Sequence, residues 1–192
     1  WGQNRLTFCR MVDTIYAEAK INVRKTSTEV TYSYMNTFEH TITVDVPVRT
    51  AYNQWTQFES FPHFMDGIEK VEQLSPTETR WYANIGGLQR AWSAEIVEQL
   101  PDKRIAWNSL YGVNNNGTIT FESLDANTTR INLRIDYEPA NMLETIGTSL
   151  GIFAGRVKSD LGNFKQFIER RGEATGAWRG EIQDGELETA NQ

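Results

Sequence analysis

The fold class of this chain is decided by residues 143–168, LETIGTSLGIFAGRVKSDLGNFKQFI. Apolar residues recur there every three or four positions, the spacing of one face of an α-helix. They are Leu143, Ile146, Leu150, Phe153, Val157, Leu161, Phe164 and Ile168. The pattern predicts a long amphipathic helix of about seven turns. Arg170 and Arg171 suit the negative end of its dipole, and Gly172 suits its C-terminus.

The residues before this helix alternate with a period of two, which is typical of strands with one buried and one wet face. The clearest case is the segment 129–137, where Ile131, Leu133, Ile135 and Tyr137 share a face. Turn residues such as Gly86-Gly87 separate the segments and favour hairpins. The predicted strands are Phe38–Val46, Ile68–Leu74, Thr79–Ile85, Leu88–Glu98, Arg104–Ser109, Gly117–Leu124 and Thr129–Tyr137.

Two short helices are predicted after the first strand. Pro47 suits the first turn of a helix, and Val48, Tyr52 and Trp55 follow it at helical spacing. The run Phe58–Met65 contains a proline and too many aromatic residues for one long regular element. We therefore predict a second short helix or helical turn there. The fold class is therefore α+β, in which a curved antiparallel sheet of six to seven strands wraps the long C-terminal helix.

The strands predicted to face the helix are rich in aromatic residues. Trp and Tyr combine an apolar body with a polar group, so they suit the lining of a pocket as well as a core. Both alternatives stay open at this point, because aromatic residues are also common in cores. The candidate ligand-binding residues are Trp55, Phe58, Phe61, Phe64, Met65, Trp81, Trp92, Trp107, Phe121, Tyr137, Leu143, Ile146, Leu150, Phe153 and Val157.

Two motifs carry a family resemblance. They are WTQFESFPHFM, residues 55–65, and WSAEIVEQLPDKRIAW, residues 92–107. With the order of elements around them, they resemble the polyketide cyclase/dehydrase and lipid-transport branch of the START-like (SRPBCC) superfamily. The segment GAWRGE, residues 176–181, is similar to the ending of bacterial members. The resemblance covers residues 35–172 and implies a helix-grip fold there. Residues 1–34 lack a sustained period, so we expect an N-terminal extension, either an appendage or a strand-like extension at Thr28–Tyr34. The acidic residues 173–192 are expected to form a flexible tail.

The resemblance also implies a deep cavity between sheet and helix for a lipid, a polyketide or a quinone-like molecule. It does not imply a reaction, because one fold serves many functions. Our leading hypothesis is a binder or transporter of a small hydrophobic molecule. One alternative is a cyclase or dehydrase that folds its substrate in the same cavity, and a second is a protein-interaction module that exposes Phe58–Met65 and Trp178.

The composition excludes some classes of binding partner. The formal net charge of -6 argues against a nucleic-acid surface and against anionic membranes. No apolar run approaches the roughly 20 residues that a membrane-spanning helix needs, so no stable membrane insertion is expected. Cys9 is the one cysteine, which excludes an internal disulfide and favours a reducing compartment, the cytoplasm by default. The oligomeric state cannot be read from the sequence.

The sequence predicts neither a metal nor another cofactor. His40 and His63 lie on separate elements without metal-ligand spacing, and no nucleophile-elbow or nucleotide motif is present. We expect His63 at the mouth of the cavity. The residues that could serve as general acids or bases beside an apolar pocket are Asp66, Arg90, Glu95 and Glu98, although surface ion pairs are the more common role for such residues.

Overall fold

The computed structural model describes residues 20–25, 30–85, 87–112, 115–137 and 148–188, with side chains for 37–84, 87–112, 115–136 and 154–188. Ten strands form one antiparallel sheet. They are β1 (Lys20–Lys25), β2 (Val30–Val44), β3 (Ile68–Gln73), β4 (Glu78–Ile85), β5 (Leu88–Leu100), β6 (Arg104–Tyr111), β7 (Asn115–Ser123), β8 (Thr129–Tyr137), β9 (Ile182–Gln183) and β10 (Glu186–Leu187). The helical elements are α1 (Val48–Trp55), the 3-10 helix η1 (Phe58–His63) and α2 (Thr148–Arg171).

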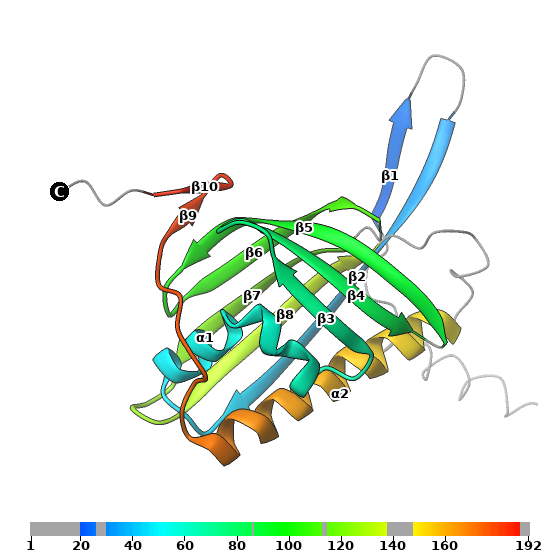
Figure 1. Cartoon of the computed structure of the whole chain (residues 1–192). Coiled ribbons are helices and arrows are strands. Elements are labelled where there is room, and N and C mark those ends of the chain that lie inside the picture. Colours follow the sequence, from blue (N-terminus) through cyan, green and yellow to red (C-terminus); the bar gives the residue numbers. More distant parts are fainter. Residues whose placement is uncertain (1–19, 26–29, 86, 113–114, 138–147, 189–192) are drawn as a thin grey trace, which may run out of the picture.

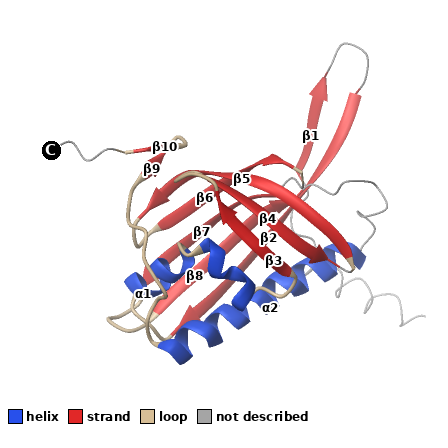
Figure 2. Cartoon of the chain, in the orientation of Figure 1, coloured by secondary structure: helices blue, strands red, loops and turns tan. Residues whose placement is uncertain are grey.

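The strands from β3 to β8 form a meander, and β2 closes its far side by pairing with β8. The order across the sheet is β1-β2-β8-β7-β6-β5-β4-β3, with β9 added beside β5 and β10 beside β9. The sheet is strongly curved, and α2 runs along its concave side (Figure 1). Figure 2 shows the helices gathered on that same side of the sheet. This arrangement confirms the predicted α+β helix-grip fold.

The predicted elements agree with the structure over most of the described chain. The strands from β3 to β8, both short helices and α2 all lie where the periodicity placed them. α2 extends to Arg171, with Gly172 following at a φ of 69°, the left-handed conformation that a helix C-terminus favours. Residues 143–147 of the predicted helix lie outside the described residues.

The N-terminal part of the sheet differs from the expectation. We placed the first strand at Phe38–Val46 and expected residues 1–34 to be an appendage or a strand-like extension at Thr28–Tyr34. β2 begins at Val30, within the segment of the second alternative, and runs unbroken through Met35. β1 pairs with the first part of β2, and this hairpin projects beyond the rest of the sheet (Figure 1). Residue 35 is therefore inside a strand and does not mark a structural boundary.

The C-terminal segment also differs from the flexible tail that we expected. Arg179 donates hydrogen bonds to both carboxylate oxygens of Asp102, at 2.9 and 2.7 Å, and Trp178 packs against the core. Ile182 is fully buried and begins β9. The two apolar residues thus anchor a segment whose acidic composition suggested mobility. Residues 189–192 lie outside the described chain.

Candidate functional site

The inner face of the sheet, which we define as the side that packs under α2, is set by strand alternation. On β8 it carries Ile131, Leu133 and Ile135, which are buried, while Arg134 lies on the outer face and is exposed. The register extends this face across the sheet, since Ile131 pairs with Ile42 and Phe121, and Ile135 pairs with Phe38 and Gly117. Two ends of this face differ in how they are covered.

The packed end lies under α1, η1 and the C-terminal half of α2. Its rings contact one another at short range: the Trp55 and Phe164 centroids are 4.9 Å apart, Phe61 and Phe64 are 5.0 Å apart, and Tyr52 lies 5.5 Å from Phe121. All six side chains are buried. Most of these pairs are tilted or edge-to-face, the geometry that aromatic quadrupoles favour. At this end the aromatic residues fill the interior themselves.

The open end lies toward the N-terminal half of α2, and its inward aromatic side chains are only partly buried. They are Phe38 on β2, Trp92 on β5 and Trp107 on β6. Leu88 continues the Trp92 side of β5 and is exposed by 57%. Tyr111 does not continue the Trp107 side of β6, because a register shift makes it pair with Ser93 on the outer face. The inner face thus grades from a closed core to an accessible aromatic wall.

Trp81 joins the two ends. Its ring lies 5.3 Å from Phe61 at the packed end and 5.9 Å from Trp92, to which it is stacked with an interplanar angle of 7°. Its Nε1–H donates to Oγ1 of the buried Thr79 at 2.9 Å. One face of Trp92 is therefore held by a fixed partner, so the open end presents a supported aromatic surface.

Trp107 lies flat against the sheet because its cross-strand partner is a glycine. A Cβ atom on Gly117 would lie 2.2 Å from Cζ2 of Trp107, which is far inside contact distance. The indole therefore occupies the space that any other side chain would take. It covers β7 with one face, and it makes no hydrogen bond that the described residues show.

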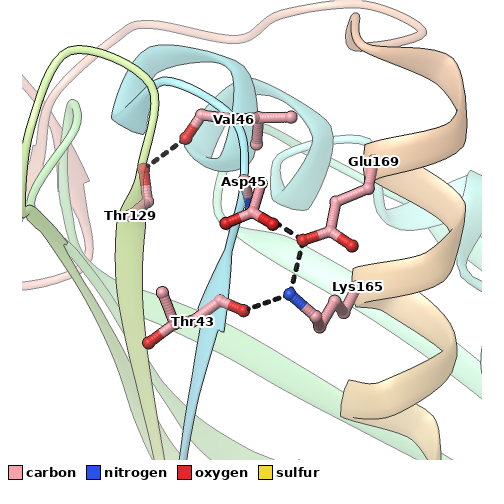
Figure 3. Close-up of polar contacts among 6 residues, drawn as sticks. All are labelled: Thr43, Asp45, Val46, Thr129, Lys165 and Glu169. Carbon is pink, nitrogen blue, oxygen red and sulfur yellow. Dashed lines mark hydrogen bonds and ion pairs between the residues drawn. The ribbon is translucent and has the colours of Figure 1, made fainter.

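α2 is held to the edge of β2 by a polar clamp near its C-terminus (Figure 3). Lys165 Nζ donates to the carbonyl of Thr43 at 2.7 Å and pairs with Glu169 Oε1 at 2.5 Å. The same Glu169 oxygen accepts the Asp45 N–H at 2.7 Å. These contacts fix how the packed half of the helix crosses the sheet.

A second clamp joins the other side of α2 to the loop between η1 and β3. The Asp66 N–H donates to Asp160 Oδ1 at 3.1 Å, and Arg156 donates to the Asp66 carbonyl. Asp160 is only 9% exposed. Burial raises the pKa of its carboxyl to about 6, against the smaller lowering effects of the Asp66 N–H and Arg156.

Of the predicted ligand-binding residues, the structure brings Trp55, Phe58, Phe61, Phe64 and Phe121 together in the packed core. Met65, Trp81 and Trp107 are partly buried against that core, and Val157 lies in it. The side chains of Tyr137, Leu150 and Phe153, and the whole of Leu143 and Ile146, lie outside the described residues. The periodicity did not signal the role of Gly117 under Trp107, since only the cross-strand register brings the two together.

The candidate acids and bases do not converge. Glu98 pairs with Arg104 at 2.9 Å, the side chain of Asp66 is exposed, and Glu95 lies on the outer face near Gly185. Arg90 stands on the Trp92 side of β5 and is exposed. Among the described residues, no three His, Cys, Asp or Glu side chains cluster as metal ligands would.

The exposed segment expected for a protein-interaction module is packed instead. Phe58, Phe61 and Phe64 are buried, and Trp178 is partly buried against the core. Of this segment, His63 is exposed and stacks on Phe167 with centroids 6.4 Å apart. The expected aromatic contact surface is therefore not available in this fold.

The outer face carries a polar hollow of about 670 Å³. Its floor is formed by β6, β7 and β8, and the turn of β9 and β10 forms one wall. Four charged side chains in it form two ion pairs, Arg104 with Glu98 and Arg134 with Asp136, and Asp184 also lines it. Trp107 and Gly117 are also among the residues that line it.

Comparisons with known proteins agree with this architecture. The family model described as polyketide cyclase/dehydrase and lipid transport matches residues 44–166. An uncharacterised 17.2 kDa Streptomyces lincolnensis protein is 46% identical over 149 residues, which are 77% of this chain and 99% of that protein. In the described part of the chain, no helix is long and apolar enough to cross a membrane.

Two solved structures show the same fold. The Zhui aromatase/cyclase from Streptomyces sp. R1128 superposes with a TM-score of 0.62 and 22% identity, over 75% of this chain and 99% of that chain. A START superfamily protein from Mycobacterium smegmatis gives 0.57 and 14%, over 70% and 95%. With the family match across more than half of the sequence, the chain belongs to the polyketide cyclase/dehydrase and lipid transport family.

Proposed function

We propose that this protein binds a small hydrophobic molecule against the open end of the inner face, beneath α2. The observation that carries this proposal is the partial burial of inward aromatic side chains at one end of a face whose other end is fully packed. A folded chain normally covers such rings with its own side chains. Accessible aromatic surface on the concave side of a sheet is what an apolar guest needs.

Trp81, Trp92 and Trp107 form the proposed wall. Burial of apolar surface contributes about 25 cal/mol per Å², so a guest that covers the free faces of Trp92 and Trp107 gains most of its affinity there. Because Trp81 and Gly117 hold these two indoles in place, little side-chain freedom is lost on binding. The proposal extends to Tyr137, Leu143, Ile146, Leu150 and Phe153, which the sequence pattern assigns to the same lining.

The packed residues have a different role in this proposal. Phe58, Phe61, Phe64, Phe121 and Trp55 form the floor of the site and support the wall from behind. The proposal includes no nucleic acid and no cofactor. A cytoplasmic location, expected from the lone cysteine, stays a prediction.

Native mass spectrometry of freshly purified protein tests the proposal. We expect a bound hydrophobic molecule that organic extraction releases, or, for extracted protein, saturable binding of an apolar probe such as 2-methylnaphthalene. A protein that carries no ligand and binds no such probe would overturn the proposal.

The Gly117→Ala variant tests the location of the site. The added methyl group displaces the Trp107 indole from its seat, so we expect probe affinity to fall about threefold to tenfold, the range of a lost aromatic contact. Gly155→Ala is the matched control, because a Cβ there meets nothing within 4 Å. Equal affinities in both variants would place the ligand elsewhere.

A further inference from the structure

His40 occupies a position on the inner face where the neighbouring side chains are apolar. Its cross-strand partner Leu133 is 3% exposed, and the next inward residues along β2 are Phe38 and Ile42, which pack against the core. The imidazole and the Phe38 ring lie 6.3 Å apart at 34°. A polar ring thus stands on the inner face, in the cross-strand row next to the one that carries Phe38 and Trp107.

The surroundings of the His40 imidazole favour its neutral form. Burial lowers its pKa below the ordinary 6.5, and the positive charge of Lys158 on α2 lowers it further. A neutral imidazole has one N–H donor and one acceptor nitrogen. It can therefore hydrogen-bond a hydroxyl or a carbonyl group without pairing with an ionised ligand.

Both of those hydrogen-bonding positions are unused within the described chain. Among the other polar groups of the interior, Thr79 accepts from Trp81 and donates to the Ala94 carbonyl, and Asp160 accepts the Asp66 N–H. The Tyr52 hydroxyl and Gln99 Nε2 are buried without a hydrogen-bond partner in the described chain. No described residue hydrogen-bonds to the ring of His40. His40 is only partly buried, and its ring nitrogens are not among the buried atoms without a partner, so the ring is accessible to a ligand hydrogen bond.

We propose that His40 selects the ligand, by accepting a hydrogen bond from, or donating one to, an uncharged hydroxyl or carbonyl group on an otherwise apolar molecule. The inference rests on the proposed function, because it places the polar group of the ligand at the same site on the inner face. Lys158 adds a second preference, since its charge disfavours a cationic ligand near the ring. His40 in this proposal is a specificity residue, and no covalent step is assigned to it.

The test uses two probes of the same shape, 2-naphthol and 2-methylnaphthalene, which differ in one hydroxyl group. Binding is measured by equilibrium dialysis at pH 7 for the wild-type chain and for His40→Phe, His40→Gln and Glu39→Gln. Glu39 neighbours His40 but lies on the outer face, where it accepts a hydrogen bond from Asn132, so it is the matched control.

We expect the His40→Phe change to shift the ratio of the two dissociation constants about fivefold to tenfold against 2-naphthol, the effect of one lost hydrogen bond. His40→Gln, which keeps a donor and an acceptor, restores most of the ratio, and Glu39→Gln leaves it unchanged. Affinity for 2-methylnaphthalene stays within about twofold throughout, because the apolar wall is intact.

The outcomes separate the two proposals. If wild type and His40→Phe bind both probes with the same ratio of dissociation constants, the role of His40 is overturned. The proposed binding site on the inner face is then still supported. Failure of the wild-type chain to bind either probe would overturn both. If His40→Phe binds both probes more weakly at an unchanged ratio of dissociation constants, this result also contradicts the specificity role of His40, because an equal loss of affinity for both probes reflects altered packing.

Discussion

The two ends of the inner face are built from the same kinds of residue but behave differently. At the packed end Trp55, Phe61 and Phe164 touch ring to ring and are excluded from solvent. At the open end Trp92 and Trp107 point the same way yet stay partly exposed. The difference is what covers the sheet, since at the packed end Trp55 of α1 contacts both Phe61 of η1 and Phe164 of α2. Aromatic content alone therefore does not distinguish a core from a binding wall.

The comparison predicts that equivalent truncations have unequal costs at the two ends. Phe164→Ala removes a fully buried ring that contacts Trp55 and Phe64, so we expect the free energy of unfolding to fall by about 3–5 kcal/mol. Trp92→Ala removes a larger but partly exposed ring, so we expect a cost below about 2 kcal/mol. Urea denaturation of both variants measures the two values.

Ligand binding should show the opposite order. Trp92→Ala is expected to weaken probe binding about threefold to tenfold, while Phe164→Ala, measured where the variant is folded, changes it little. Similar stability losses in the two variants would mean that the ends are equally packed, and the proposed wall would be part of the core.

The sequence predicted the elements better than it predicted this division. Periodicity placed Trp81, Trp92 and Trp107 on one side of the strands, because alternation depends only on local geometry. It could not show that Phe58, Phe61 and Phe64 close one end of the interior, because that depends on where η1 lies relative to α2. The candidate list therefore combined residues of the floor with residues of the wall.

Polar contacts between distant segments were equally hidden. Asp160 is one of several polar residues in the sequence of the helix. Its sequence neighbours do not indicate that it accepts a hydrogen bond from the backbone of Asp66. The seating of Trp107 over Gly117 depends on the register of β6 with β7. The acidic composition of the C-terminal segment suggested mobility, but the burial of Ile182 holds this segment against the sheet.

The Asp160 clamp predicts a pH-dependent stability. Because its folded-state pKa of about 6 exceeds the unfolded value near 3.8, the folded state binds the proton more tightly. Stability is therefore lost as the pH rises from about 4 to 6, and the loss is complete above 6. It amounts to at most about 3 kcal/mol, from 1.36 kcal/mol per pKa unit.

The Asp160→Asn variant isolates this effect, since an amide oxygen can still accept the Asp66 N–H. We expect the variant to gain stability relative to wild type between pH 4 and pH 7, as followed by urea midpoints at several pH values. Glu169→Gln, at the other clamp, is the control for general effects of charge removal. Curves for wild type and Asp160→Asn that stay parallel across this window would contradict the assigned cause.

The smallest expected effect concerns the Lys165 clamp at the packed end (Figure 3). Lys165→Met removes a partly exposed ion pair with Glu169 and a hydrogen bond to Thr43, so we expect a loss of about 0.5–1 kcal/mol in urea denaturation. Lys70→Met, which breaks the more exposed pair with Glu72, should cost less. The buried rings of Trp55 and Phe64 hold Phe164 of α2 at this end, so a polar contact at its margin only sets the alignment of the helix. A decrease of more than about 2 kcal/mol in the free energy of unfolding would instead mean that the Lys165 clamp, and not aromatic packing, holds the packed end closed. The difference between the packed and open ends would then be caused by charged contacts.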